Sequence, residues 1–384
     1  MDAIITGWGH TRFGRHEESF EALLQGAARE ALEHAGVQPD DVDAIFLGHF
    51  NAGMVADAFA SSLVLGLDES LRFTPATRLE NACASGSAAV YAARDFIRAG
   101  SGRVALVIGA EKMSEQDTAG VTRALAGAAY QAEEAGLSFP QIFGRIAQGY
   151  FQAYGNQSDV LARIAAKNHA NAMHNPLAQM HKPLDFTFCN TVSDKNPLIA
   201  PPLRMSDCSL VRDGAAALVM VADDMAQDFP RAVGFRAVQV NDFLPLSRRD
   251  MTELAGAQAA FSGSFDAAGV TVDGLDVADV HDCFTIAELL IYKAMGLTAK
   301  GQGRRAIEEG RVAAAGDLPV NLSGGLKAKG HPVGATGVSM HVMAARQVTG
   351  EAGAIQRPGA ALGCVFNMGG AGVANYCSVL EVVK

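Results

Sequence analysis

Hydrophobic residues recur along this chain in short unbroken runs that alternate with longer runs of helical spacing. The apolar runs at residues 3–7, 42–47 and 103–111 predict buried strands. Residues 20–35 have apolar positions at helical spacing and end before Gly36, so they predict a helix. Strands that alternate with helices are typical of a layered α/β fold with a largely parallel sheet.

The same pattern predicts further elements. Helical spacing at residues 53–65, 159–173, 286–295 and 338–348 indicates helices, and residues 213–221, 360–362 and 373–380 indicate strands. The alternation breaks at residues 112–156, which we interpret as a partly helical insertion. Insertions between core elements often cover active sites, and we expect this one to act as a cap.

Short matches between the two parts of the sequence indicate an internal repeat. Ala35-Gly36-Val37 recurs as Ala268-Gly269-Val270, and Ala84-Ser85-Gly86 recurs as Ala335-Thr336-Gly337. We therefore expect two similar α/β halves, residues 1–225 (with the cap at 112–156) and residues 226–384. Their strand ends would converge on one shared site.

Composition narrows the class of protein. The 384 residues are 49% hydrophobic and only 19% charged, which suits a well-buried oligomer, and the net charge of −10 argues against a nucleic-acid partner. The sequence has no apolar run long enough to span a membrane. We also expect neither a signal peptide nor a peroxisomal targeting signal. The six cysteines read as free thiols. We expect a cytoplasmic enzyme.

Cys83 is the first candidate for chemistry. It stands among small residues, in Asn-Ala-Cys-Ala-Ser-Gly, just before the helical run at 90–97. Backbone N–H groups and the dipole at a helix N-terminus favour an anion, so we expect a lowered thiol pKa at Cys83. The alternative is a buried cysteine that packs a helix against a sheet.

Three further stretches in the second half carry candidate chemistry. His281-Asp282-Cys283-Phe284 stands where a strand ends and a helix begins, although His281 could also simply cap a loop. Gly330-His331-Pro332 stands in a glycine-rich loop before a helix, with His331-Pro332 where a phosphate-binding loop requires Lys-Ser/Thr. Residues 363–372 form a glycine-rich turn, either a tight hairpin or a source of N–H donors.

Other classes of site fit these stretches less well. A zinc site of His281, Cys283 and His331 would explain neither Cys83 nor the glycine loops. Gly370-Ala371-Gly372 is half of a dinucleotide fingerprint, and no suitable strand–helix unit follows it. We therefore expect no metal site.

In order and spacing, these stretches together resemble the thiolase family over nearly the whole chain. The His-Asp-Cys-Phe motif is similar to that of sterol-carrier-protein-type and archaeal thiolases, whereas many other thiolases have Asn-Glu-Ala-Phe there. The resemblance implies an α/β thiolase fold, in which two similar halves pack as five layers, α-β-α-β-α.

The resemblance also implies roles for site residues. Cys83 would be the nucleophile that carries the acyl group, His331 its base and an oxyanion donor, and Cys283 the second acid/base. His281 would orient a water in the oxyanion hole, and the backbone N–H groups of Cys83 and Gly369 would hold the acyl-enzyme oxygen.

One position departs from the family pattern. Most thiolases have a second catalytic cysteine in a Cys-x-Gly motif at the glycine turn, where this chain has Asn367-Met368-Gly369. Cys283 would replace that cysteine. Cys364 lies nearby in the sequence, but its spacing to the glycines is wrong, so we expect a structural role for it.

The implied activity is acyl transfer between CoA thioesters, with acyl-CoA and CoA as substrates and no permanently bound cofactor. The resemblance also implies a homodimer or homotetramer and allows a small zinc-ribbon/OB-fold partner protein. One alternative is a partner-dependent or non-catalytic thiolase-like protein. The other is a ketoacyl or hydroxymethylglutaryl-type synthase, which generally uses two histidines without a cysteine at the position of Cys283.

Overall fold

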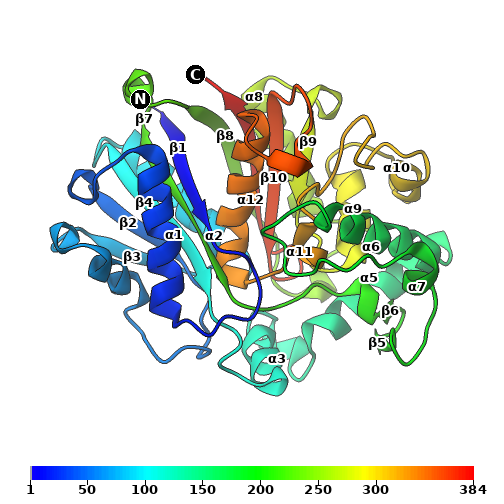
Figure 1. Ribbon diagram of the computed structural model, residues 1–384. Helices are drawn as coiled ribbons and strands as arrows, with labels where there is room; N and C mark the ends of the chain where they lie inside the picture. The colour runs from blue at the N-terminus through cyan, green and yellow to red at the C-terminus, as the bar shows by residue number, and fades with distance from the viewer. Residues whose placement is uncertain (1) are drawn as a thin grey trace.

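A mixed sheet of nine strands crosses the part of the chain that the computed structural model describes, residues 2–384 (Figure 1). In spatial order the strands are β3 (Ala76–Leu79), β2 (Ala44–Gly48), β4 (Val104–Glu111), β7 (Gly214–Ala222), β1 (Ala3–His10), β8 (Val233–Asn241), β11 (Ala374–Val382), β10 (Leu362–Gly369) and β9 (Val277–Val280).

The prediction of a largely parallel sheet is wrong. Within the described residues, the parallel pairs are β3–β2, β2–β4 and β9–β10, and the other neighbours are antiparallel. β10 and β11 are joined by the short turn at residues 370–373, which imposes an antiparallel pair. The sequence pattern of buried strands does not encode strand direction.

The sheet repeats itself as the sequence matches predict. The order β2-β4-β7-β1 in the first half corresponds to β9-β10-β11-β8 in the second, and the pairing directions also correspond. The halves meet where Ile4 and Ile5 of β1 pair with Gly234 and Val233 of β8. Glycines end the equivalent helices α1 (Phe20–Ala35) and α8 (Ala255–Ala268), with Gly36 at φ 74° and Gly269 at φ 68°.

Helices complete five layers. α1 packs on β1, β4 and β7, and α8 packs on β8 and β11. Between the two half-sheets lie α2 (Ser85–Arg98) and α12 (Val333–Val348), and α12 contacts both β4 and β10. In Figure 1, α1 lies at the left and α12 near the centre. The predicted order α-β-α-β-α is confirmed.

The central helices α2 and α12 touch through glycines. A Cβ atom on Gly86 would lie 2.7 Å from the Gly334 carbonyl oxygen, and one on Gly337 would lie 2.2 Å from the Ser87 nitrogen. Neither distance is possible for a side chain, so the backbones of the two helices approach as closely as glycine allows. This contact brings the residues that precede each helix, Cys83 and His331, to one place.

The insertion between β4 and β7 is longer than the predicted 112–156, because more elements precede β7. It contains α3 (Thr118–Ala126), α4 (Gln131–Glu134), α5 (Phe139–Tyr154), α6 (Ser158–Ala172), α7 (Phe186–Asn190), β5 (Leu198–Ala200) and β6 (Leu203–Arg204). In the second half, α9 (Thr285–Ala294), α10 (Arg304–Glu308) and α11 (Gly325–Ala328) follow β9.

Two local predictions differ from the structure. Residues 53–65 do not form an α-helix: a 3-10 helix covers Ala60–Leu67, and the residues before it include Asn51, Ala52 and Gly53 at positive φ. Left-handed backbone cannot continue a right-handed helix. The predicted glycine turn at 363–372 is mostly strand, because β10 continues to Gly369.

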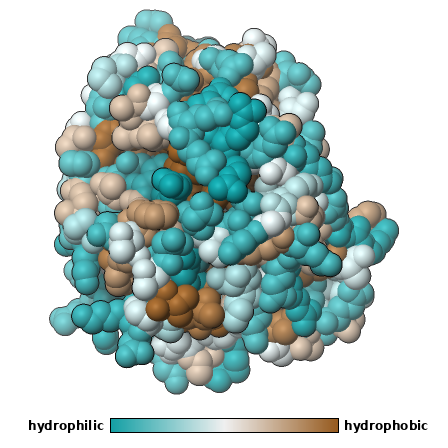
Figure 2. All heavy atoms as spheres, turned by 90° about the vertical axis from the view of Figure 1, so that its right-hand side faces the viewer, coloured by the Kyte–Doolittle hydropathy of each residue, from teal (hydrophilic) through white to brown (hydrophobic). Residues whose placement is uncertain are grey.

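The face at the right of Figure 1 is mostly hydrophilic, with small groups of apolar side chains (Figure 2). Exposed apolar residues around α7, β5 and β6, elements at the lower right of Figure 1, include Val192, Leu198, Ile199 and Met205. Across the described residues 2–384, helices with the length and apolar character needed to cross a membrane are absent.

Candidate active site

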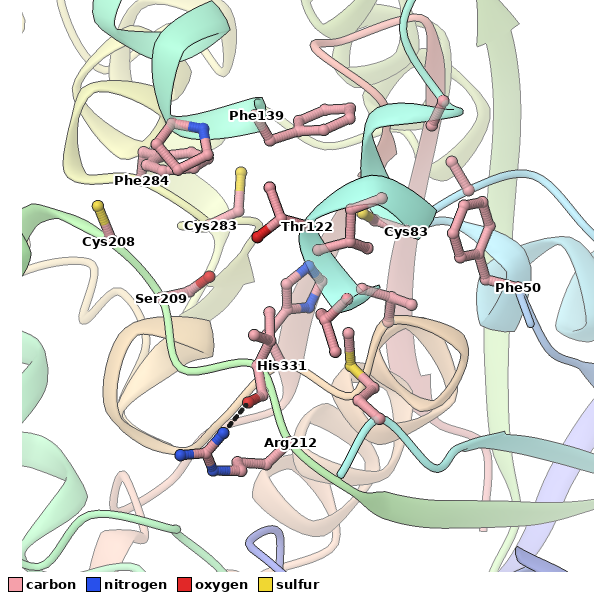
Figure 3. A pocket seen from close by; sticks show the side chains of 18 of the residues that line it. Phe50, Cys83, Thr122, Phe139, Cys208, Ser209, Arg212, Cys283, Phe284 and His331 are labelled. Atoms are coloured by element: carbon pink, nitrogen blue, oxygen red, sulfur yellow. Dashed lines mark hydrogen bonds between the residues drawn. The ribbon is translucent and has the colours of Figure 1, made fainter. Parts of the chain in front are cut away.

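Cys83 stands on a tight loop between β3 and α2. Ala82 before it has φ 51°, in the left-handed region that costs a non-glycine residue on the order of 1 kcal/mol. The Ser85 hydroxyl holds this turn, since it accepts from the Asn81 N–H at 2.9 Å and donates to the Ala82 carbonyl at 2.6 Å. The strained turn presents the sulfur to the cavity in Figure 3.

The expectation of a lowered thiol pKa is wrong. Burial, and then the Glu111 carboxylate, raises the pKa of Cys83 to about 12, although the backbone N–H groups of Cys83 and Gly370 act on the pKa in the opposite direction. Desolvation of the thiolate therefore outweighs the helix terminus and N–H donors. At neutral pH Cys83 is a thiol, and it needs a base before it can attack.

His331 has an unprotonated ring nitrogen that could accept a proton. Its Nδ1 lies 2.7 Å from Thr336 Oγ1, whose single hydrogen is donated to the Pro332 carbonyl oxygen at 2.9 Å. Oγ1 must therefore accept from Nδ1–H, which leaves the lone pair of the neutral imidazole on Nε2. Burial and then the charge of Lys329 lower the pKa of His331 to about 3, so the ring is neutral.

His281 has the opposite tautomer. Asn367 Nδ2 lies 3.2 Å from the Cys83 carbonyl oxygen, which can only accept, and 2.9 Å from His281 Nδ1. Asn367 Oδ1 accepts from the Ser87 hydroxyl at 2.8 Å, which agrees with this orientation of the amide. His281 Nδ1 therefore accepts, and the ring hydrogen is on Nε2. Burial, and then His331, lowers the pKa of His281 well below its usual value.

His281 Nε2 is a buried donor that lacks a partner among the described residues 2–384. The two imidazole rings are nearly perpendicular, with centroids 5.2 Å apart. Nitrogen atoms of both rings and the Cys83 sulfur all lie within 4.8 Å of one another. The site thus combines a thiol, a basic nitrogen and an N–H donor. That N–H disfavours a metal site, because His281 has no lone pair to offer there.

Cys283 lines the same cavity (Figure 3). Burial and then the neighbouring Cys83 raise the pKa of Cys283 well above its usual value, so it also rests as a thiol. Asp282, next to it, accepts backbone N–H bonds from Leu326 at 2.6 Å and Lys327 at 3.2 Å. These bonds join the His-Asp-Cys-Phe loop to the loop that carries His331.

Glu111 is a positioning residue that the sequence analysis missed. Its buried carboxylate at the end of β4 accepts from the N–H groups of Phe50, Asn51 and Gly334, each at 3.0 Å. The third bond fixes the first turn of α12, directly after His331. A lone glutamate after an apolar strand gives no sequence signal for this role, because its partners are backbone groups from two distant loops.

The structure brings four predicted residues, Cys83, His281, Cys283 and His331, to one cavity or its immediate wall. Gly369 pairs with Ala374 in the sheet, while the next residue, Gly370, lines the cavity. Cys364 is buried in β10, with its sulfur 3.9 Å from that of Cys377, away from the cavity wall. Asn367 and Thr336, which set the tautomers, were not predicted as functional.

Comparison with known proteins identifies the family. The profile "Thiolase, N-terminal domain" matches residues 2–184, and "Thiolase C-terminal domain-like" matches residues 239–382. An acetyl-CoA acetyltransferase of Methanothermobacter thermautotrophicus is 36% identical over 97% of this chain and 97% of its own length. The chain belongs to the thiolase family.

A more distant relative and a solved structure of similar fold also match the chain. Human sterol carrier protein 2 is 28% identical over 95% of this chain and 69% of its own length. The solved structure of the Ltp2-ChsH2(DUF35) aldolase has a TM-score of 0.83 over 100% of this chain and 98% of that chain, at 21% identity. The predicted family, thiolase fold and acyltransferase class are confirmed.

Proposed function

We propose that this thiolase transfers acyl groups between CoA thioesters through an acyl-enzyme on Cys83. The observation that carries the proposal is the placement of the Cys83 sulfur and nitrogens of His281 and His331 within 4.8 Å of one another, beside a cavity that Cys283 also lines. CoA thioesters are the substrates, and the scheme needs no permanently bound cofactor.

In the first step His331 Nε2 takes the proton of the Cys83 thiol as the sulfur attacks the carbonyl of the substrate. The thiolate never has to form in the resting enzyme, which its raised pKa opposes. When a 3-ketoacyl-CoA is cleaved, the bond between Cα and the attacked carbonyl breaks, and the electron pair moves onto the acetyl-CoA enolate. The acyl group stays on Cys83 as a thioester.

Cys283 then gives its proton to Cα of the enolate, which leaves as acetyl-CoA. Because Cys283 rests as a thiol, it is ready for this donation. CoA-SH next gives its proton to the Cys283 thiolate and attacks the acyl-enzyme carbonyl. The acyl group leaves on CoA, and His331 returns its proton to the Cys83 sulfur. In the condensation direction, the Cys283 thiolate must form first and then remove the Cα proton. The Cys83–His331 pair serves both directions.

Two oxyanions need donors. For the enolate oxygen we propose His281 Nε2–H, directly rather than through the expected water, because this buried hydrogen lacks a partner among the described residues 2–384. For the acyl-enzyme oxygen we propose the N–H groups of Cys83 and Gly370 in addition to the predicted Gly369, because both groups favour negative charge on the Cys83 sulfur and Gly370 lines the cavity. Loss of one such donor typically costs about 10²–10³-fold in rate.

A thiolysis assay tests the proposal. Purified protein is incubated with CoA and 3-ketoacyl-CoAs, acetoacetyl-CoA among them, and loss of the ketoacyl absorbance is followed. Cys83→Ala should lower kcat by at least about 10⁴-fold, since no covalent intermediate remains. Intact-protein mass spectrometry should detect the acyl group on wild-type protein and not on this variant.

Cys283→Ala should still accept the acyl group on Cys83 from an acyl-CoA but should lose ketoacyl cleavage. Cys208→Ala is the matched control, because Cys208 lines the same cavity and has no role in the scheme. A wild-type protein that neither cleaves any ketoacyl-CoA nor traps an acyl group would contradict the proposal. Full activity in Cys283→Ala would contradict the second role alone.

A second candidate is an enzyme that works only with a partner protein. The aldolase of similar fold, at a TM-score of 0.83, is named with a second component, ChsH2(DUF35), and this supports a partner protein for this chain as well. Robust thiolysis by the isolated chain would exclude this candidate.

We also propose the predicted homodimer or homotetramer. The exposed side chains of Phe59 and Phe73, near the edge strand β3, support an interface there.

A further inference from the structure

The cavity in front of Cys83 has a predominantly apolar wall. Its volume is about 210 Å³. Apolar side chains from five separate segments of the chain contribute to it, around residues 50, 113–140, 211, 284 and 333. Because these segments converge from both halves and from the insertion, the apolar surface surrounds the reacting sulfur.

Helix α3 forms one complete side of this cavity. Thr118, Val121, Thr122 and Leu125 all line it, at the spacing i, i+3, i+4, i+7 that defines one helix face. Phe139, at the start of α5, continues the same wall. Figure 3 shows Phe139 and Phe284 together at one end, with Thr122 between the two cysteines.

Charge is confined to the opposite end. Among the described residues that line the cavity, Arg212 is the one charged side chain. Figure 3 places it on the far side of His331 from Phe139 and Phe284. A carboxylate carried into the aromatic end would therefore lose most of its hydration without gaining a cation, and the Thr122 hydroxyl would offer at most a neutral donor. Such a transfer costs several kcal/mol.

The size of the cavity sets a lower limit on a well-fitting ligand. An apolar cavity of about 150 Å³ holds a benzene molecule, and this cavity is larger, at about 210 Å³. An acetyl or acetoacetyl group alone would leave most of the apolar wall without contacts. A chain or ring of about six carbons would cover the faces of Val121, Leu125 and Phe139.

On these grounds, and resting on the proposed function, we propose that the acyl group carried by Cys83 is bulky and uncharged. The acyl class is a medium-length, branched or aromatic chain of about six carbons or more, seated against α3 and Phe139. Dicarboxylic acyl groups are excluded from this end, and acetoacetyl-CoA is a poor substrate. Leu125 and Phe139 are thus specificity-determining residues.

Binding of unreactive CoA thioethers tests the class without turnover. The dissociation constants of S-ethyl-, S-butyl-, S-hexyl-, S-(2-phenylethyl)- and S-(5-carboxypentyl)-CoA are measured by calorimetry on the wild-type protein. Each buried methylene should tighten binding about fourfold. The hexyl and phenylethyl thioethers should bind best, and the terminal carboxylate should cancel the gain from the chain.

Leu125→Trp fills the cavity and should abolish the preference for the hexyl over the ethyl thioether. Ala119→Trp is the matched control, because Ala119 lies on α3 but not on the cavity wall, and it should keep that preference. The kcat/KM values for 3-ketoacyl-CoAs of increasing length should rise in parallel on the wild-type protein.

Equal affinity for the ethyl and hexyl thioethers, or tighter binding of the carboxypentyl thioether, would overturn the inference. These results are independent of the proposed function, since they need no chemistry. Thioether affinity could rise with chain length while no ketoacyl-CoA is cleaved and Cys83 stays unacylated. That result would support the proposed acyl site and contradict the proposed reaction.

Discussion

Two histidines of one ring type do different work in this site because their neighbours differ. Thr336 accepts from His331 Nδ1–H and leaves Nε2 basic, whereas Asn367 donates to His281 Nδ1 and leaves Nε2–H as a donor. From the resemblance we expect Asn367 to stand where most thiolases have a cysteine. If so, this position controls the tautomer of His281 in place of supplying a second thiol.

We expect Asn367→Ala to lower kcat by about 10–100-fold with little change in affinity for S-hexyl-CoA, because His281 loses the bond that fixes its tautomer. Calorimetry and steady-state kinetics separate these effects, and ¹⁵N NMR of the histidine rings should show a mixture of His281 tautomers. Ser87→Ala, which removes the partner of Asn367 Oδ1 alone, should have a smaller effect. A parallel loss of affinity would indicate a merely structural role.

The pH profile of the reaction should lack the usual histidine limb. A base works only when deprotonated, and the pKa of His331 is lowered to about 3, so the ring stays neutral through its ordinary titration range. We expect kcat/KM for a 3-ketoacyl-CoA to be flat from pH 8 down to pH 6. Stopped-flow measurements across this range check it, and an acid limb near pH 6.5 would contradict the assigned environment.

At the scale of elements, the contact between α2 and α12 holds Cys83 and His331, the proposed nucleophile and base, together. Gly86→Ala would place a Cβ atom 2.7 Å from the Gly334 carbonyl oxygen, and backbone cannot yield locally. We expect a loss of about 3 kcal/mol in unfolding free energy. We also expect about 100-fold lower activity, because Cys83 and His331 move apart.

Gly26→Ala provides the matched control for this contact. Gly26 lies inside α1, and a Cβ atom there would meet nothing within 4 Å. It should therefore raise stability by up to about 1 kcal/mol and leave activity unchanged. Chemical denaturation and thiolysis of both variants check the pair. Equal behaviour of the two substitutions would show that helix propensity, not the contact, controls stability.

Elements with a strong local pattern were predictable. The strand around Leu106 and the helix ending at Gly36 follow directly from apolar spacing and a terminal glycine. Strand direction, the 3-10 helix Ala60–Leu67 and the extent of β10 depend on packing, which spacing does not record. The predicted direction of the Cys83 pKa shift was also wrong, because the desolvation that raises this pKa comes from residues distant in the sequence.

The residues of the site were likewise predictable only where a local sequence motif marks them. Cys83, His281, Cys283 and His331 stand in motifs whose order resembles a family, so a sequence could point to them. Asn367 and Glu111 act through backbone carbonyls, backbone N–H groups and a ring nitrogen supplied by other segments. Such partners leave no pattern in the chain around the residue itself.

At the scale of the whole molecule, buried neutral histidines couple stability to pH. Burial lowers the pKa of His10, His169 and His331 to about 3 and that of His341 to about 4. In the unfolded chain these rings take up protons below about pH 6.5, while the folded protein does not. The unfolded state thus binds more protons, so stability falls as pH decreases from about 6.5 to about 4.

These four rings alone would give a slope of roughly 5 kcal/mol per pH unit. The lowered pKa of His281 adds to this slope, whereas the raised pKa values of Asp282 and Asp279 oppose it, because the folded protein holds those protons more tightly. The remaining slope is enough to consume a typical domain stability within a few pH units. We expect acid unfolding with a midpoint between about pH 4 and 5.5. Circular dichroism across a pH series, with urea titrations at each pH, measures the slope. Constant stability from pH 7 to pH 4.5 would contradict it, and His341→Gln should reduce the slope by about one quarter.

The repeat in the sheet explains how equivalent loops of the two halves can place two different side chains in the same cavity. In a symmetric pair of identical chains, equivalent loops must carry identical residues. Here the loop before α2 carries Cys83, and the corresponding loop before α12 carries His331. Because both halves belong to one covalent chain, the two loops can carry different residues, which suits the proposed roles of Cys83 as nucleophile and His331 as base. Different residues in the two equivalent loops of the repeat therefore require that both halves belong to one continuous chain.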